Sequence, residues 1–173
     1  LNGVEVCRQL LKHKALSRIH GTLIIVPVVN IFGFIHRSRY LPDRRDLNRC
    51  FPGSSKGSLG ARMAYIFRTQ ILNHCTHAID MHTGAIHRSN LPQIRANLDN
   101  PTAEMMAKAF GAPVIIDSKL RDGSLRQCAD EADISLILYE AGEALRFDDN
   151  AIRGGIRGVL NVAAIKAPGF GER

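Results

Sequence analysis

The sequence predicts an α/β fold in which a mixed, mostly parallel sheet is sandwiched between helices. Near-continuous apolar runs of strand length occur at residues 21–30, 76–82 and 134–140. Such runs are typical of strands that are buried on both faces. Segments with helical spacing of apolar residues lie between them, and this alternation is the pattern of α/β proteins.

The first half of the chain alternates between helical and extended patterns. Residues 3–13 repeat apolar side chains every three or four positions, which predicts a helix, whereas "GTLIIVPVVN" at 21–30 predicts a strand. The stretch 36–49 is rich in arginine and contains proline, so we expect a structured loop there. Helical spacing returns at 59–74, and "THAIDMH" at 76–82 predicts a second strand.

The second half continues the alternation with shorter elements. Pro101 favours a helix that begins just after it, and turn residues bound the short apolar runs that predict strands. The strands are expected at 93–97, 113–117 and 134–140, and the helices at 102–110, 123–132 and 148–162.

Length and composition bound the organisation of the protein. The chain has 173 residues, of which 45% are hydrophobic, and this suffices for the core of one domain, which we assign to residues 1–162. The four cysteines are widely spaced, so we expect free thiols in a reducing compartment. No apolar run approaches the roughly 20 residues of a membrane span, and no targeting segment is evident. These features predict a cytoplasmic protein without a membrane partner.

The formal net charge of +7 calls for an anionic partner. Much of the excess lies in the loop 36–49, which also contains Pro42, Asp43 and Asp46 and is therefore not a basic tail. A local arginine cluster binds a small carboxylate or phosphate at least as well as a duplex, so nucleic acid is not the expected partner. A noncatalytic basic domain that binds anionic ligands or nucleic acid remains an alternative. The arginines of this loop are Arg37, Arg39, Arg44, Arg45 and Arg49.

Polar residues follow three of the predicted strands. Asn30, His82 and Glu140 each come at the carboxyl end of an apolar run. Ligands of open α/β sheets gather outside the carboxyl ends of strands. A histidine and a glutamate at equivalent strand ends therefore indicate a candidate metal ligand and a candidate general base.

Three motifs resemble one known family. "RDLNRCFPG" at 45–53, "IDMHTG" at 79–84 and "LYEAGE" at 138–143 resemble, in this order and spacing, the succinylglutamate desuccinylase/aspartoacylase family of the zinc carboxypeptidase superfamily. The resemblance runs from Leu1 to about Val162. It implies a metal-dependent amidohydrolase with one zinc ion, which cleaves the amide bond of a small anionic N-acyl amino acid. A zinc carboxypeptidase acting on peptides is a further alternative.

The resemblance also implies a role for each matched residue. His82 corresponds to a zinc ligand. Glu140 corresponds to the glutamate that activates water and passes its proton to the leaving amine, and Arg39 to an arginine that polarises the scissile carbonyl. The residues implied in substrate binding are Asn48, Arg49 and Arg126.

The two ends of the chain depart from the family pattern. The other two zinc ligands of the family come from an H-G-x-E element, which this chain lacks, so we expect an incomplete, N-terminally truncated domain that is inactive and binds zinc weakly or not at all. Residues 157–173 resemble a segment of the group I chaperonins. We therefore expect residues 163–173 to be a foreign, mobile tail. The sequence leaves the acyl group, the amino acid and the oligomeric state open.

Overall fold

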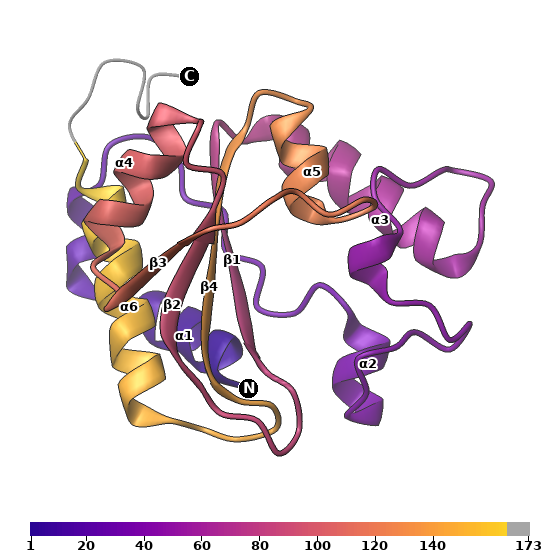
Figure 1. Cartoon of the computed structure of the whole chain (residues 1–173), viewed down its shortest axis with the longest axis horizontal. Coiled ribbons are helices and arrows are strands. Elements are labelled where there is room, and N and C mark those ends of the chain that lie inside the picture. Colours follow the sequence, from indigo (N-terminus) through magenta and orange to yellow (C-terminus); the bar gives the residue numbers. More distant parts are fainter. Residues whose placement is uncertain (166–173) are drawn as a thin grey trace. The chain divides into compact units, whose positions relative to one another are not determined.

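The computed structural model describes residues 1–165, whose ribbon is shown in Figure 1. The 3₁₀ helices are labelled η. The elements are α1 (Asn2–Leu10), η1 (Lys14–Arg18), α2 (Ile31–His36), η2 (Leu47–Arg49), α3 (Leu59–Gln70), η3 (Leu72–His74), β1 (His77–Gly84), β2 (Asn90–Ala96), α4 (Pro101–Phe110), β3 (Val114–Asp117), α5 (Leu125–Asp130), β4 (Ser135–Glu143) and α6 (Asp149–Ala163).

The strands form one sheet in the order β1-β4-β2-β3. Strand β2 pairs in parallel with β3 and antiparallel with β4, so the sheet is mixed. The predicted α/β class, with a mixed, mostly parallel sheet and helices, is confirmed.

The helices begin where the sequence supplies capping side chains. An Asn, Ser or Asp side chain at the residue before the helix accepts a hydrogen bond from an amide of the first turn, which satisfies a donor that has no partner within the helix. These capping residues are Asn30 of α2, Ser58 of α3, Asn100 of α4, Ser124 of α5 and Asp148 of α6.

The chain divides into two compact units. Among the described residues, unit 1 comprises Leu1–Pro27, Ile79–Lys119 and residues 136–165, and unit 2 comprises Val28–Ala78 and Leu120–Ser135. Unit 1 holds most of the sheet with α1, α4 and α6. Unit 2 holds α2, α3 and α5 with the arginine-rich loop.

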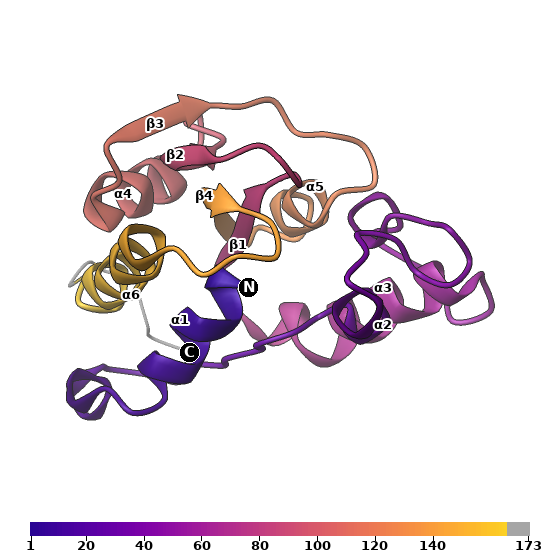
Figure 2. The ribbon, with the colours of Figure 1, turned by 90° about the horizontal axis from the view of Figure 1, so that it is seen from below.

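The core of unit 1 lies between the sheet and its three helices. Figure 2 shows α1, α4 and α6 together on one side of the sheet. Alternate residues of β4, Ile137, Tyr139 and Ala141, are buried in this core. Helix α6 approaches α4 closely because Gly158 of α6 packs against the Phe110 ring. A Cβ atom at Gly158 would lie 2.3 Å from this ring. The polar alternate residues of the strands therefore face the other side of the sheet.

The predicted strand at 21–30 is wrong. The segment forms neither helix nor strand, and Leu23 and Ile24 are exposed. A strand is stable only when its backbone groups pair with a neighbour, and no described strand pairs with this segment. Pro27 within it also lacks an amide donor. Asn30 consequently follows no strand and instead caps α2, where its Oδ1 accepts a hydrogen bond from the Gly33 amide at 2.8 Å.

Three other expectations concern the cysteines, a membrane span and the predicted tail. The four cysteines are free thiols, as predicted. None of the helices within residues 1–165 is long and apolar enough to cross a membrane. Helix α6 includes Ala163, the first residue of the predicted tail, and the part of that tail beyond Ile165 lies outside the described residues.

Candidate active site

His82 lies on β1 next to a carboxylate. Its Nε2 atom is 2.9 Å from Oδ2 of Asp80, and both side chains are about three-quarters buried. Ile79 and Met81 pack against the core of unit 1. Because side chains alternate along a strand, Asp80 and His82 project from the opposite face. A carboxylate at this position fixes the orientation of the imidazole ring.

Glu140 projects from the same face of the neighbouring strand. Its flanking residues Tyr139 and Ala141 are buried in the core, so the glutamate points away from it. Strands β1 and β4 are adjacent in the sheet. Gly84 of β1 also lies against Gly142 of β4, since a Cβ atom at Gly84 would be 3.1 Å from the Gly142 carbonyl oxygen. The sheet of unit 1 thus brings His82 and Glu140 onto one polar face.

Two side chains of β2 hold the Glu140 carboxylate. The Nδ2 atom of Asn90 donates to Oε1 at 2.9 Å, and the Nε atom of Arg95 donates to Oε2 at 2.9 Å. The pairing of β2 with β4 shifts register between Asn90 and Gln93, which is the mark of a bulge or irregularity. Such irregularities re-aim side chains in sheets, and here one lies where Asn90 reaches the glutamate.

Both candidate residues lie inside strands, which corrects their predicted position at strand ends. Strand β1 continues to Gly84 and β4 continues to Glu143. The apolar runs stop earlier because only the core-facing positions need apolar side chains. The two residues are therefore held by ladder hydrogen bonds on a rigid sheet rather than by loops.

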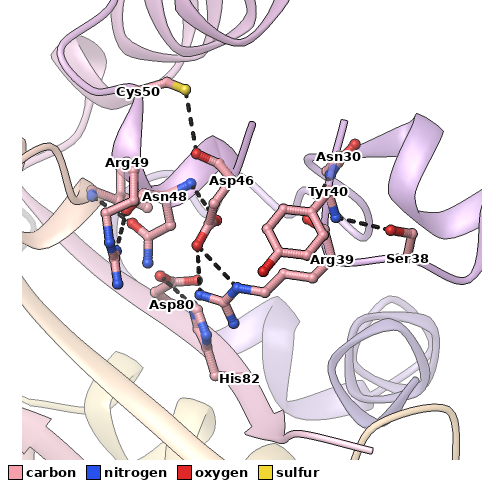
Figure 3. A network of polar contacts seen from close by, with 11 residues as sticks. Asn30, Ser38, Arg39, Tyr40, Asp46, Asn48, Arg49, Cys50, Asp80 and His82 are labelled. Atoms are coloured by element: carbon pink, nitrogen blue, oxygen red, sulfur yellow. Dashed lines mark hydrogen bonds and ion pairs between the residues drawn. The ribbon is translucent and has the colours of Figure 1, made fainter. Parts of the chain in front are cut away.

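Arg39 is paired within the arginine-rich loop of unit 2. Its Nε and Nη2 atoms each lie 2.9 Å from Oδ2 of Asp46 (Figure 3). The other oxygen of Asp46, Oδ1, accepts a hydrogen bond from the Asn48 amide at 3.0 Å and caps η2. Asp46 therefore fixes the arginine and the start of the Asn48–Arg49 turn together.

Asn48 connects this turn to the start of α5. Its Oδ1 accepts a hydrogen bond from the Leu125 amide at 2.8 Å. This contact assigns the oxygen of the side-chain amide, so Nδ2 is the end that could donate to a ligand. Arg49 donates from Nη1 to the Asn48 carbonyl and is exposed. Arg126, which directly follows Leu125, is buried at 8% exposure.

A glycine allows the two segments to approach. Gly123 has a φ of +71°, and a Cβ atom there would lie 2.8 Å from the Arg49 carbonyl oxygen. The Gly123 carbonyl in turn accepts a hydrogen bond from the Phe51 amide at 3.0 Å. Unit 2 thereby brings the three predicted substrate-binding residues onto adjoining segments. His82 and Glu140 belong to unit 1, and Arg39, Asn48, Arg49 and Arg126 belong to unit 2.

The residues present do not fit a zinc ion by themselves. Within residues 1–165, no group of three or more His, Cys, Asp or Glu side chains could hold a metal. His82 supplies one ligand, whereas catalytic zinc sites use three protein ligands and keep one position open.

The family comparison agrees with the motifs. The model of the succinylglutamate desuccinylase/aspartoacylase catalytic domain matches residues 1–166. The chain belongs to this family. The two activities in the description of the family, succinylglutamate desuccinylase and aspartoacylase, are those of deacylating hydrolases. No curated protein matches the chain.

Solved structures of this family share the fold. A succinylglutamate desuccinylase/aspartoacylase from Rhodobacter sphaeroides is 28% identical, with a TM-score of 0.83, and the match covers 94% of this chain and 50% of that one. The product-bound ectoine utilization protein EutE (DoeB) from Ruegeria pomeroyi is 27% identical, with a TM-score of 0.84, and 93% and 52% are covered. The chain therefore spans about half the length of these relatives.

A more distant structure extends the likeness in fold. The murein-tripeptide amidase MpaA from Escherichia coli O157 is 16% identical, with a TM-score of 0.62, and the match covers 96% of this chain and 76% of that one. At this identity the likeness concerns the fold alone, and it agrees with the predicted zinc-carboxypeptidase-like class.

Sequence reasoning missed Asn90 and Arg95 as partners of Glu140. Alternation in β2 offered a partial signal, because Arg95 lies between the apolar residues Ile94 and Ala96 and must face away from the core. The antiparallel pairing of β2 with β4 decides the contact, and no local pattern specifies which strands pair.

Proposed function

We propose that this chain carries part of an amidohydrolase centre that cleaves the amide bond of an N-acyl amino acid. The observation that carries the proposal is the shared polar face of β1 and β4. It presents His82, oriented by Asp80, beside the strand of Glu140. Membership of a deacylase family supports the same chemistry.

Glu140 is suited to general base and general acid chemistry. A carboxylate can take a proton from the attacking water and deliver it to the leaving amine. Asn90 and Arg95 limit the rotation of this carboxylate, because each holds one of its oxygens. A fixed carboxylate loses little entropy when it aligns with the scissile bond.

The substrate anion is assigned to the residues of unit 2. Asn48 would donate from Nδ2 to a substrate carboxylate, and Arg49 and Arg126 would supply the positive charge. Arg39 would polarise the scissile carbonyl, as the resemblance implies. Arg39 and Arg45 already pair with Asp46 and Asp43, so part of the charge of the loop is compensated internally. This pairing favours a small anion over a duplex.

The family resemblance implies a zinc ion, but within residues 1–165 His82 is the one ligand that the chain supplies for it. The steps assigned to Glu140, Arg39 and Asn48 do not depend on how the remaining ligands are supplied.

The test compares two proteins with N-succinyl-L-glutamate as the probe. Release of the free amine is measured at saturating zinc for the 173-residue chain and for the same chain preceded by a strand and turn that carry His-Gly-x-Glu. The longer protein should hydrolyse the probe, and Glu140→Gln should abolish turnover without loss of folding. Absence of turnover in a folded, zinc-loaded longer protein would refute the proposal. Binding to DNA that falls steeply with salt would then favour the noncatalytic alternative.

A further inference from the structure

A cavity lies in unit 1, on the helix-covered side of the sheet. Its volume is about 240 Å³, and none of its lining residues belongs to the candidate active site. One face of α6 forms one wall. The residues of that wall recur at helical spacing and therefore share a face; they are Asn150, Arg153, Gly154 and Arg157.

The rim of the cavity carries two positively charged side chains of α6. Arg153 and Arg157 are exposed and lie one helical turn apart, where like charges repel. Among the described residues neither forms an ion pair with a carboxylate. Arg153 instead donates from Nη2 to Oδ1 of Asn150 at 2.8 Å. Two guanidinium groups placed in this way favour an anion with several acceptor oxygens.

Two closely packed rings form the floor of the cavity. The rings of Phe110 and Tyr139 lie with centroids 4.7 Å apart. Gly154 packs directly against this floor, because a Cβ atom at this position would lie 2.8 Å from the Tyr139 hydroxyl oxygen. That hydroxyl donates to the Ala151 carbonyl at 2.9 Å. The remaining apolar wall is formed by Pro92, Ala112 and Pro113.

We propose that this cavity binds a small organic anion. Its carboxylate or phosphate contacts Arg153 and Arg157, and its small apolar body contacts the wall of Pro92, Ala112 and Pro113. The competing explanation is that the two arginines only compensate the partial negative charge at the carboxyl end of α4, which ends at Phe110. In that case they would bind no ligand.

The probe is benzoate, with benzamide as the neutral isostere and inorganic phosphate as the anion without an apolar body. Each compound is titrated into the ¹⁵N-labelled 173-residue chain, and amide shifts are followed by NMR. Benzoate should shift the amides of Gly111, Ala112 and Gly154 in a saturable way, more strongly than either control. Shifts confined to Asn48 and Arg49, or equal binding of benzamide, would overturn the proposal. Phosphate binding as tight as benzoate would overturn the assigned apolar contact.

Variants separate the charge from the shape of the cavity. Arg153→Gln combined with Arg157→Gln should weaken benzoate at least about tenfold, as expected for the loss of charge-assisted hydrogen bonds. Gly154→Ala should weaken it, because the added methyl group would displace the Tyr139 hydroxyl and reshape the floor of the cavity. Arg146→Gln is the matched control, because Arg146 is an exposed arginine that pairs with Glu143 and does not line the cavity. Unchanged benzoate affinity in the folded double variant would refute the site.

Discussion

Replacing Asn48 by aspartate or by alanine separates its two roles, one in the fold and one in ligand binding. The oxygen Oδ1 accepts the Leu125 amide across 77 positions of sequence. Alanine removes this acceptor and leaves a partly buried donor at the start of α5 without its partner. The expected cost is about 1–2 kcal/mol of unfolding free energy. Aspartate keeps an acceptor oxygen at the same place, so stability should change by less than about 0.5 kcal/mol.

Ligand binding should be weakened more by aspartate than by alanine, which is the reverse of the order expected for stability. Aspartate replaces the donor Nδ2 by a second oxygen and sets a negative charge against the substrate carboxylate. The loss of a hydrogen bond to a charged group costs about 1.5–3 kcal/mol, so affinity for N-succinyl-L-glutamate should fall by at least about tenfold. Asn48→Ala loses the donor without adding repulsion and should bind more tightly than Asn48→Asp.

The measurements are hydrogen exchange and calorimetry. Exchange of the Leu125 amide reports the local contact directly, which matters because the chain has two units and global unfolding need not be two-state. Protection should be lost in Asn48→Ala and retained in Asn48→Asp. Equal loss of protection in both variants would refute the assigned hydrogen bond. Native affinity in Asn48→Asp would refute the role of Nδ2.

Three further perturbations test other contacts. Arg95→Gln should make carbodiimide labelling of Glu140 about tenfold faster, measured by mass spectrometry, because a charge-assisted hydrogen bond to the carboxylate is lost. Burial, with a smaller contribution from the charge of Asp148, raises the pKa of Tyr139 to about 12. The folded state therefore holds the phenol proton more tightly than the unfolded state. This contributes about 2 kcal/mol of unfolding free energy, which is fully present below pH 10 and should be lost as the pH rises from about 10 to about 12. Tyr139→Phe should remove this loss in alkaline denaturation followed by circular dichroism. Asp46→Asn keeps the acceptor for the Asn48 amide but ends the ion pair of Arg39, so affinity for N-succinyl-L-glutamate should rise by up to about fivefold, since an exposed pair contributes at most about 1 kcal/mol.

Each of these expectations has a contrary outcome. An unchanged labelling rate in Arg95→Gln, with Glu143 as the internal reference, would show that the arginine does not shield the Glu140 carboxylate. The same alkaline loss of stability in Tyr139→Phe would assign that loss to another group. Weaker binding in Asp46→Asn would show that Asp46 positions Arg39 for the ligand instead of competing with it.

The sequence predicts elements well where one periodic pattern decides them. Strand β4 and helix α6 follow from a long apolar run and from a sustained helical stripe, and both lie close to their predicted ranges. The segment 21–30 has an equally apolar pattern, but a strand also needs a partner for its backbone groups. Composition says nothing about that partner, which is why this prediction failed.

The candidate site shows the same division. His82 and Glu140 stand out because each comes at the end of an apolar run. Asn90 ends no such run, and its contact with Glu140, 50 positions away in the sequence, depends on a register shift between β2 and β4. The Oδ1 contact of Asn48 with Leu125 is also invisible locally, because it depends on how two distant segments of unit 2 approach. Long-range pairing decides both contacts, and local periodicity does not encode it.

The polar groups of the candidate site are already paired within the protein, so a ligand must compete with these pairs. Arg39 is held by Asp46, and Glu140 is held by Arg95 and Asn90. Such pairing keeps polar groups satisfied without a ligand and reduces the entropy lost when one binds. It also opposes binding, because the scissile carbonyl of the substrate must compete with Asp46 for the Arg39 guanidinium. Asn48 differs from both, since its contact with Leu125 uses the acceptor end of the side chain and leaves the role of the donor end to the ligand. Among these residues Asn48 therefore combines rigidity with the least competition, and this makes its substitution the most discriminating test of how the chain binds an anion.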